Sequence, residues 1–173
     1  MQSEQNQINN PETGGENHAK PRVLLLNGPN LTMLGRRDPE KYGTFTLDDV
    51  IESTRIKSAE LGYSLISFQS NHEGELIDKI HEMMDSCAGI LINAGALTHY
   101  SYALRDAIEL CPVPVIEIHI SDIENREDFR RNSVIRPVCS GQISGFGLNS
   151  YLMGMDYLEG ILSTGSEEAD EQE

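Results

Sequence analysis

A chain of 173 residues is long enough for one α/β domain with a real core and too short for two ordinary domains. Its 28 acidic and 13 basic side chains give a net charge of −15, which argues against nucleic acid or an anionic membrane surface as a partner. No apolar run approaches the roughly 20 residues of a membrane span. No secretory signal is visible, and the three cysteines are widely spaced without a CxxC pair, so we expect a protein of the reducing cytoplasm with no disulfide framework and no zinc site.

Composition divides the chain into three parts. Residues 1–20 are rich in Gln, Asn, Glu and Gly, and are expected to form a disordered N-terminal tail because they bury too little apolar surface to offset the entropy of ordering. Residues 163–173 carry five acids and no base, so an acidic, disordered C-terminal tail is expected there. The remaining domain, residues 21–162, still has 20 acidic against 12 basic side chains, so any anion site in it requires a local cluster of positive charge.

Strand and helix patterns alternate between the tails. In chain order, the expected elements are a strand at 23–27, a helix from a capping box at Thr46 and Asp49 to Gly62, a strand at 63–68, a helix striped by Leu76, Ile80 and Met83, a strand at 89–93, a helix at 101–110, a strand at 113–120, a short helix at 126–131, a strand at 134–140 and a closing helix striped from Leu148 to Leu162. Five such units predict an α/β fold, a doubly wound sheet of five parallel strands in flavodoxin-like order with helices on both faces.

The first four expected strands all run into polar side chains at their carboxyl ends, where ligands bind in such sheets. Asn27 and Asn30 follow the first strand, Asn71 and His72 the second, Asn93 and His99 the third, and His119, Ser121 and Asp122 the fourth. Taken singly, Asn and Ser are ordinary turn formers and helix caps, and His119 could be a structural histidine. Its imidazole nevertheless alternates with Ile118 and Ile120 and so faces the opposite side of the sheet. Four polar strand ends together favour a binding cleft.

The common ligands of this architecture leave other signatures. No GxGxxG follows the first strand, and the chain has no GxxxxGK[ST], GxSxG or HExxH motif. Asn93 stands where a phosphorylatable receiver would have Asp at the end of its third strand. Dinucleotide, nucleotide, serine-nucleophile and metal sites are therefore disfavoured.

The loop over residues 34–43 is long and bounded by glycines, as active-site lids are. It places Arg36, Arg37 and Lys41 near Tyr42, and a guanidinium beside a phenol favours the phenolate. The alternative is a solvated, charged loop whose tyrosine packs on its own stem. Paired with His119, the loop indicates a base and an acid, which suit proton abstraction next to a carbonyl and expulsion of a hydroxyl.

Eight motifs follow one another in order: NGPNL (27–31), RRDPEKYG (36–43), QSNHEG (69–74), NAGALTH (93–99), ALRDA (103–107), EIHIS (117–121), REDFR (126–130) and GFGLNSY (145–151). On these motifs the chain resembles the type II 3-dehydroquinate dehydratases over residues 22–162, that is, everything except the tails. The resemblance implies a flavodoxin-like fold and a hydro-lyase that needs neither metal nor cofactor. The implied reaction is the reversible anti elimination of water from 3-dehydroquinate to 3-dehydroshikimate through an enolate, in the shikimate pathway or in quinate breakdown.

The resemblance also implies a role for each matching residue. Tyr42 matches the base, Arg37 the arginine that favours the phenolate, His119 the general acid, Glu117 the acid that orients this histidine, and Asn30 the residue that holds a water near the enolate oxygen. The expected substrate-binding residues are Asn93, His99 and Arg130 for ring hydroxyls, and Ile120 and Ser121, whose backbone N–H groups would grip the carboxylate as helix N-termini do.

The implied assembly is a dodecamer built from trimers, in which Asp106 reaches the active site of a neighbouring subunit. The chain departs from the family pattern at Asp122, where Asn is common, at Glu124 and Asn125, where His-Ala is usual, and at Asn132, where His is frequent. Bulky Tyr100 and Tyr102 flank Ser101. We expect Asp122 to cap a following helix and point outward.

Two rival functions come from other classes. A flavin- or nucleotide-binding module would share the fold but should carry a phosphate loop after the first strand. A catalytically silent scaffold would be expected to lack Tyr42, Arg37 or His119, and the sequence retains all three.

Overall fold

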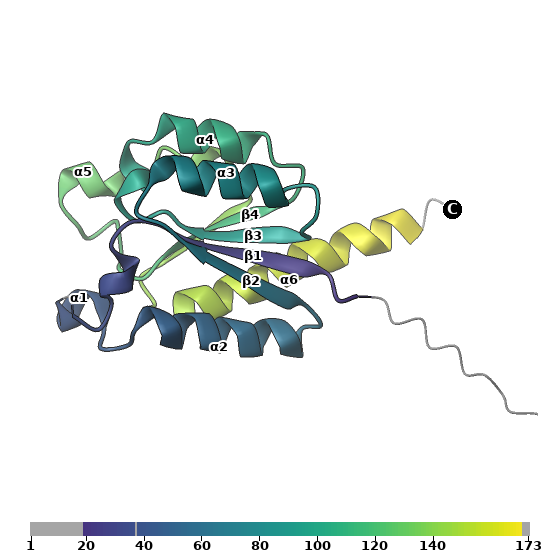
Figure 1. The fold of residues 1–173 in the computed structure, drawn as a ribbon, viewed down its shortest axis with the longest axis horizontal. Coiled ribbons are helices and arrows are strands. Elements are labelled where there is room, and N and C mark those ends of the chain that lie inside the picture. The colour runs from purple at the N-terminus through teal and green to yellow at the C-terminus, as the bar shows by residue number, and fades with distance from the viewer. Residues whose placement is uncertain (1–18, 37, 171–173) are drawn as a thin grey trace, which may run out of the picture.

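Five parallel strands form the centre of the molecule, and helices cover both faces of the sheet (Figure 1). The computed structural model describes residues 19–36 and 38–170. The strands are β1 (Arg22–Asn27), β2 (Ser64–Gln69), β3 (Gly89–Asn93), β4 (Val115–His119) and β5 (Gly141–Ser144). The helices are α1 (Pro39–Tyr42), α2 (Leu47–Glu60), α3 (Glu73–Met83), α4 (Tyr102–Glu109), α5 (Asp128–Arg131) and α6 (Asn149–Asp170). Short 3₁₀ helices occur at η1 (Leu31–Met33), η2 (Gly95–His99) and η3 (Arg136–Val138).

The strand order is β2-β1-β3-β4-β5, and each neighbouring pair is parallel. This confirms the predicted flavodoxin-like order. The chain leaves β1 toward β2 on one side and later crosses to β3 on the other, so a crevice is expected outside the carboxyl ends of β1 and β3. Asn27 and Asn93 are register partners at those two ends.

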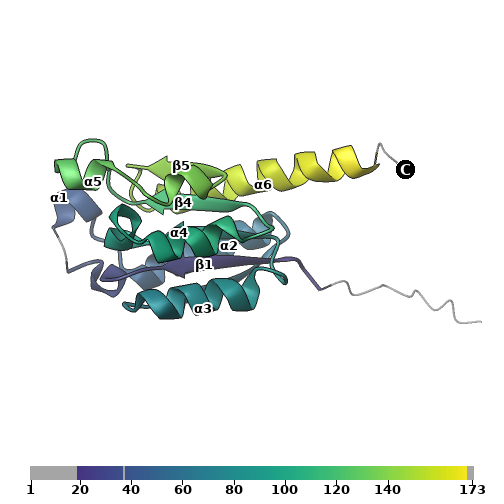
Figure 2. The ribbon, with the colours of Figure 1, turned by 90° about the horizontal axis from the view of Figure 1, so that it is seen from above.

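Two cores lie on the two sides of the sheet. Leu24 and Leu26 of β1 belong to the core beneath α3 and α4, whereas Val23 and Leu25 belong to the core beneath α2 and α6. Figures 1 and 2 show these helix pairs on opposite faces of the sheet. Successive side chains of β1 from Val23 to Leu26 point alternately into the two cores, so each of them must be apolar. This is why β1 appears in the sequence as a continuous apolar run.

Local signals place the helices that flank these strands. The capping box at the start of α2 forms as predicted: Thr46 Oγ1 accepts from Asp49 N at 3.2 Å, and Asp49 Oδ2 accepts from Thr46 N at 2.8 Å. Ser101 caps α4 in the same way, since its hydroxyl oxygen accepts from Leu104 N at 2.9 Å. The N-termini of α2 and α4 are therefore each capped by the side chain of the residue before the helix.

The predicted fifth strand at 134–140 is wrong. The segment forms η3 instead, and β5 comes later, at Gly141–Ser144, where it pairs with β4. Pro137 lacks the N–H that a strand next to β4 must donate, so it suits a turn rather than a ladder. Val134 and Ile135 are buried all the same, which explains why the segment looked like a strand.

The last helix is longer than its apolar stripe. α6 runs to Asp170, so residues 163–170 are helical where the sequence predicted a tail without structure. Thr164 Oγ1 donates to the carbonyls of Gly160 and Ile161, both at 3.0 Å, which attaches this side chain to its own helix. Figure 2 shows the end of α6 projecting beyond the sheet. Of the predicted N-terminal tail, residues 1–18 lie outside the described part of the chain. None of the helices described is long and apolar enough to cross a membrane.

Candidate active site

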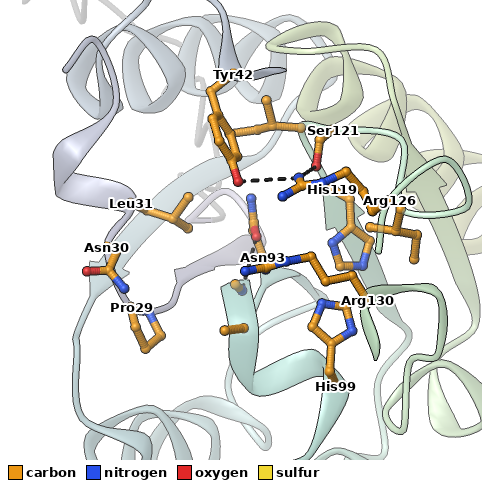
Figure 3. A pocket seen from close by; sticks show the side chains of 14 residues that line it. Pro29, Asn30, Leu31, Tyr42, Asn93, His99, His119, Ser121, Arg126 and Arg130 are labelled. Atoms are coloured by element: carbon orange, nitrogen blue, oxygen red, sulfur yellow. Dashed lines mark hydrogen bonds between the residues drawn. The ribbon is translucent and has the colours of Figure 1, made fainter. Parts of the chain in front are cut away.

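A cavity opens at the carboxyl edge of the sheet, between the ends of β1, β3 and β4 and the segments that carry α1 and α5 (Figure 3). Its lining is Pro29, Asn30, Leu31, Tyr42, Asn93, Gly95, Ala96, His99, His119, Ile120, Ser121, Ile123, Arg126 and Arg130. Polar side chains that follow three of the strands therefore meet at one place. Eight of the predicted site residues line this cavity: Asn30, Tyr42, Asn93, His99, His119, Ile120, Ser121 and Arg130.

Two predicted site residues lie elsewhere and one lies outside the described residues. Glu117 stands behind His119 on the same face of β4. Asp106 is exposed on α4 and does not line the cavity. Arg37 is outside the described part of the chain, so its predicted role stays a prediction.

His119 and Glu117 form a deeply buried polar pair at the site. His119 Nε2 lies 2.7 Å from Glu117 Oε1, and the two side chains are 6% and 0% exposed. Residues two apart on a strand share a face, whereas Ile116, Ile118 and Ile120 enter the core on the other face, as the alternation predicted. A carboxylate only accepts hydrogen bonds, so Nε2 carries the proton and Nδ1 is left for other chemistry.

Tyr42 ends the short helix α1 and reaches the cavity from outside the sheet. Asp38 caps α1, with Oδ1 accepting from Glu40 N at 3.1 Å. Gly43 ends the helix with φ 73°, and a Cβ there would lie 2.6 Å from the ring of Phe45. Glycine is thus required for the turn that presents Tyr42. The predicted lid segment contains a helical turn rather than loop alone.

Arg126 lines the cavity although the sequence analysis did not predict it as a site residue. Its Nη1 donates to Tyr42 Oη at 3.3 Å and to Ser121 Oγ at 3.0 Å, and its guanidinium carbon lies 5.7 Å from the centre of the Tyr42 ring (Figure 3). Burial by itself would lower the pKa of Arg126, but the hydrogen bond and the charge interaction with Tyr42, together with Glu127, raise it. The signal was present, because Arg126 opens the REDFR motif of which only Arg130 had been assigned a role.

Asn93 is oriented by a buried chain of hydrogen bonds. Its Nδ2 donates to Tyr151 Oη at 2.8 Å, and Tyr151 Oη donates to Asn27 Oδ1 at 2.9 Å. On the other side of the amide, Oδ1 accepts from Gly95 N at 3.2 Å. Tyr151 is fully buried on α6, and this burial raises the pKa of its phenol. The amide of Asn93 therefore cannot flip, and one N–H of its Nδ2 stays available to a ligand.

His99 and Arg130 form the wall opposite Tyr42. His99 Nδ1 lies 2.8 Å from the carbonyl oxygen of Asn132, so Nδ1 donates and Nε2 is an acceptor. Burial lowers the pKa of His99 by more than the hydrogen bond to Asn132 raises it, and this keeps the ring neutral near pH 7. The departure from the family pattern at Asn132 leaves this bond intact, because a backbone carbonyl makes it. Arg130 lies 3.5 Å from Glu127 through Nε and stacks 4.9 Å from the ring centre of Phe129.

Asn30 lies at the mouth of the cavity in a left-handed conformation with φ 66°, which Asn tolerates better than most residues. Its backbone N–H donates to Asn71 Oδ1 at 2.9 Å. The polar end of β2 thus holds the turn after β1 in place.

The carboxyl end of β4 differs from the expected helix N-terminus. Ile120 and Ser121 are followed by turns, and α5 begins only at Asp128. Asp122 is exposed and caps one of these turns, since its carboxylate accepts from Glu124 N at 3.0 Å and from Asn125 Nδ2 at 2.6 Å. It points outward as expected, but it caps a turn rather than a helix. A helix dipole therefore makes no contribution at Ser121.

The cavity is positively charged within an acidic protein. Its fourteen lining residues include two arginines and two histidines and no carboxylate. Such a lining attracts an anionic ligand. No cluster of three or more His, Cys, Asp or Glu side chains in the described residues is arranged to hold a metal ion.

A flavodoxin-like sheet that brings a phenol–guanidinium pair and an imidazole–carboxylate pair to one cationic cavity defines an enzyme of the acid–base class. The sequence model of the family described as Dehydroquinase class II matches residues 21–159. The chain belongs to this family.

Similar proteins agree with this membership. The 3-dehydroquinate dehydratase of Caldicellulosiruptor bescii is 52% identical over 142 residues, which are 82% of this chain and 98% of that protein. The 3-dehydroquinate dehydratase of Thermotoga neapolitana is 48% identical over 145 residues, 84% of this chain and 99% of that protein. The crystal structure of the type II dehydroquinase from Butyrivibrio crossotus has a TM-score of 0.78 at 43% identity, and the match covers 80% of this chain and 97% of that one.

Proposed function

We propose that this chain is a hydro-lyase that dehydrates 3-dehydroquinate to 3-dehydroshikimate, the reaction for which its relatives are named. The substrate is a carboxylate with ring hydroxyls and a ketone, and it suits a cationic cavity lined by amide, hydroxyl and imidazole groups. The elimination removes a proton next to the ketone and expels the hydroxyl β to it. The product is a conjugated enone.

We propose that Tyr42 is the base. Arg126 donates to its phenol oxygen and so favours the phenolate, which removes the proton next to the ketone. Arg37 lies on the same segment and is proposed to add a second positive charge. The electron pair of the broken C–H bond moves to the ketone oxygen as an enolate, and a water held by Asn30 would donate to that oxygen.

The acid in this proposal is His119. The carboxylate of Glu117 holds Nε2 and stabilises the imidazolium, so Nδ1 can deliver a proton to the departing hydroxyl, which leaves as water. The enolate then collapses, the carbon–oxygen bond breaks and the enone forms. The proton taken by Tyr42 returns to solvent at the end of the cycle, while His119 is reprotonated.

The remaining lining residues are proposed to bind the substrate. Asn93 offers an N–H and neutral His99 an acceptor to ring hydroxyls, and Arg130 adds a donor. Arg126 and the backbone of Ile120 and Ser121 would hold the carboxylate. The acid–base groups and the amide donors account for each step without a metal or cofactor, so we expect activity to survive EDTA.

We also propose the homododecamer built from trimers, with Asp106 of one subunit reaching the site of another. The exposed position of Asp106 on α4 is compatible with this role. Mixing Asp106→Ala with Tyr42→Phe subunits under exchange should then give more activity than the sum of the two parents. A fully active monomer would contradict the shared site. A cytoplasmic location stays a prediction.

A single observation carries the proposal: Tyr42, bonded to Arg126, and His119, held from behind by Glu117, face one cavity. The test is to incubate the protein with 3-dehydroquinate and follow the ultraviolet absorbance of the conjugated enone. Absorbance should rise with the wild-type chain and not with Tyr42→Phe. No rise with folded wild-type protein, at any pH from 5 to 10, would reject the proposal.

A further inference from the structure

Glu117 accepts hydrogen bonds from three residues in different parts of the chain. His119 Nε2 lies 2.7 Å from Oε1, Ser133 Oγ donates to Oε1 at 2.7 Å, and Gln142 Nε2 donates to Oε2 at 2.9 Å. Glu117 is fully buried. A buried carboxylate is costly unless its oxygens are satisfied, and these three bonds satisfy them.

Arg136 fixes the direction of two of these bonds. Its backbone N–H donates to Ser133 Oγ at 3.0 Å, and its Nη1 donates to Gln142 Oε1 at 2.6 Å. Since the Ser133 oxygen accepts from Arg136, its own proton is directed at Glu117. Since arginine is only a donor, the Gln142 amide must turn its oxygen toward Arg136 and its NH₂ group toward Glu117.

Donors alone therefore surround Glu117, and donors favour the ionised form of a carboxylate. We propose that Arg136, Ser133 and Gln142 are positioning residues that keep Glu117 ionised, and that they thereby hold His119 in the protonated state an acid requires. This inference rests on the proposed function, which assigns the acid to His119 but gives no role to these three residues.

In the described part of the chain, two neutral groups and two arginines lie near this network. Burial lowers the pKa of His99, which interacts with both Glu117 and His119, so its ring is neutral near pH 7. Burial and the negative charge of Glu117 raise the pKa of the Cys139 thiol, which therefore stays protonated. The positive charge of Arg130 also lowers the pKa of His99. Arg136 is exposed and does not contact Glu117 directly. The Gln142 amide links them, because it accepts from Arg136 and donates to Glu117.

The first test compares Gln142→Leu with Gln142→Glu. Leu keeps the approximate volume and removes both hydrogen bonds, so we expect kcat to fall about tenfold with KM within about twofold. The limb on which activity declines at high pH should move down by about one pH unit, because the imidazolium loses part of its stabilisation. Glu places a second carboxylate beside Glu117, so the loss of kcat should be larger than with Leu.

Arg136 tests the origin of the effect at an exposed position, where folding is little affected. Arg136→Met should reduce kcat about threefold and shift the same limb, and Arg136→Lys should restore both, because an ammonium also donates to Gln142 Oε1. Arg55→Met is the matched control: Arg55 is exposed on α2 and pairs with Glu52 at 2.6 Å. It should leave kcat and the pH profile unchanged.

A readout without turnover separates this inference from the proposed function. With ¹³C-labelled histidine, the NMR signal of His119, assigned with His119→Asn, should titrate at lower pH in Gln142→Leu than in the wild type. If the wild type fails to dehydrate 3-dehydroquinate, the proposed function fails, while this titration still tests the network. If Gln142→Leu does not fold, the same titration in Arg136→Met and Arg136→Lys tests the inference. An unchanged His119 titration in folded Gln142→Leu or, failing that, in Arg136→Met would overturn the inference.

Discussion

Tyr42 and His119 face the same cavity from regions of very different construction. Tyr42 ends a four-residue helix outside the sheet, and Arg126 bonds its phenol at 3.3 Å. His119 stands on β4, between two neighbouring strands, with its ring 2.7 Å from a carboxylate that two further side chains hold. Its side chain is 6% exposed.

The difference indicates which properties each region controls. On the His119 side, the polar groups that tune the acid also satisfy one another inside the protein, so function and stability depend on the same bonds. On the Tyr42 side, the tyrosine is half-buried at the end of a four-residue helix outside the sheet, so function can be lost while the fold persists. Substitutions on the two sides should therefore separate activity from stability.

The largest effect is expected from Tyr42→Phe. Removing the phenol oxygen eliminates the base, so kcat should fall by about 10²–10⁴-fold, the usual contribution of general acid–base catalysis. The free energy of unfolding should change by less than about 1 kcal/mol, the scale of one hydrogen bond. Enone absorbance and urea denaturation measure the two quantities. A large loss of stability would show that the Tyr42 side is not independent of the fold.

Glu117→Gln should have the next largest effect. We expect it to lower both kcat and the free energy of unfolding. The amide cannot stabilise the imidazolium as a charge does, so we expect kcat to fall about 10–100-fold. Its NH₂ group also meets another donor, either the Gln142 amide or the Ser133 and His119 pair, and the unfolding free energy should fall by about 1–3 kcal/mol. Unchanged stability would mean that the buried carboxylate is not the centre of this network. The same urea series, with Tyr42→Phe beside it, makes the comparison direct.

Arg126→Met removes the cation from the Tyr42 side without touching the phenol. The phenolate is then less favoured, so the limb on which activity rises with pH should move to higher pH, with kcat at pH 7 about tenfold lower. Arg126→Lys keeps the charge and should move that limb less. Arg55→Met is again the control, since Arg55 is exposed on α2 and pairs with Glu52 at 2.6 Å. An unmoved limb in Arg126→Met would assign the tuning of the base to another residue.

The smallest effect concerns His99. Because burial lowers its pKa, the folded protein binds fewer protons here than the unfolded chain does. Stability from this group is therefore complete above the ordinary histidine value of about 6.5 and declines as pH falls below it. The melting temperature of the wild type should drop between pH 7 and pH 5 slightly more than that of His99→Gln. If the melting temperatures of the two proteins fall equally between pH 7 and pH 5, the His99 ring is protonated as easily in the folded protein as in the unfolded chain.

The parts of the fold that the sequence predicted correctly depend on local or periodic signals. β3 has the predicted limits, and the capping box of α2 forms between residues three apart. The segment at 134–140 has the apolar content of a strand, but Pro137 cannot donate a backbone hydrogen bond to β4, and the segment forms η3. β4 pairs with Gly141–Ser144 instead. Local sequence does not reveal this choice, because strand pairing depends on the whole sheet. The end of α6 was misplaced because a charged segment lacks an apolar stripe and can still continue a helix.

The site was predictable where strand ends dictate position. Asn93 and His119 end β3 and β4, so alternation and topology place them at the carboxyl edge. Arg126 was missed because its direction depends on the turns after Ser121, which no periodicity reveals. Tyr151 was missed for a related reason: its contacts with Asn27 and Asn93 join residues 124 and 58 positions apart.

The phenol of Tyr151 has a consequence at the alkaline limit of the protein. Since burial raises its pKa in the fold, the unfolded chain releases this proton near the ordinary tyrosine value of about 10 while the folded chain still holds it. Stability from this group is complete below that pH and falls by up to about 1.4 kcal/mol per pH unit above it. A spectrophotometric titration with base follows the ionisation of the tyrosines. Tyr151 should ionise only when the sheet separates from α6, so its late absorbance would mark the loss of the site and the fold together.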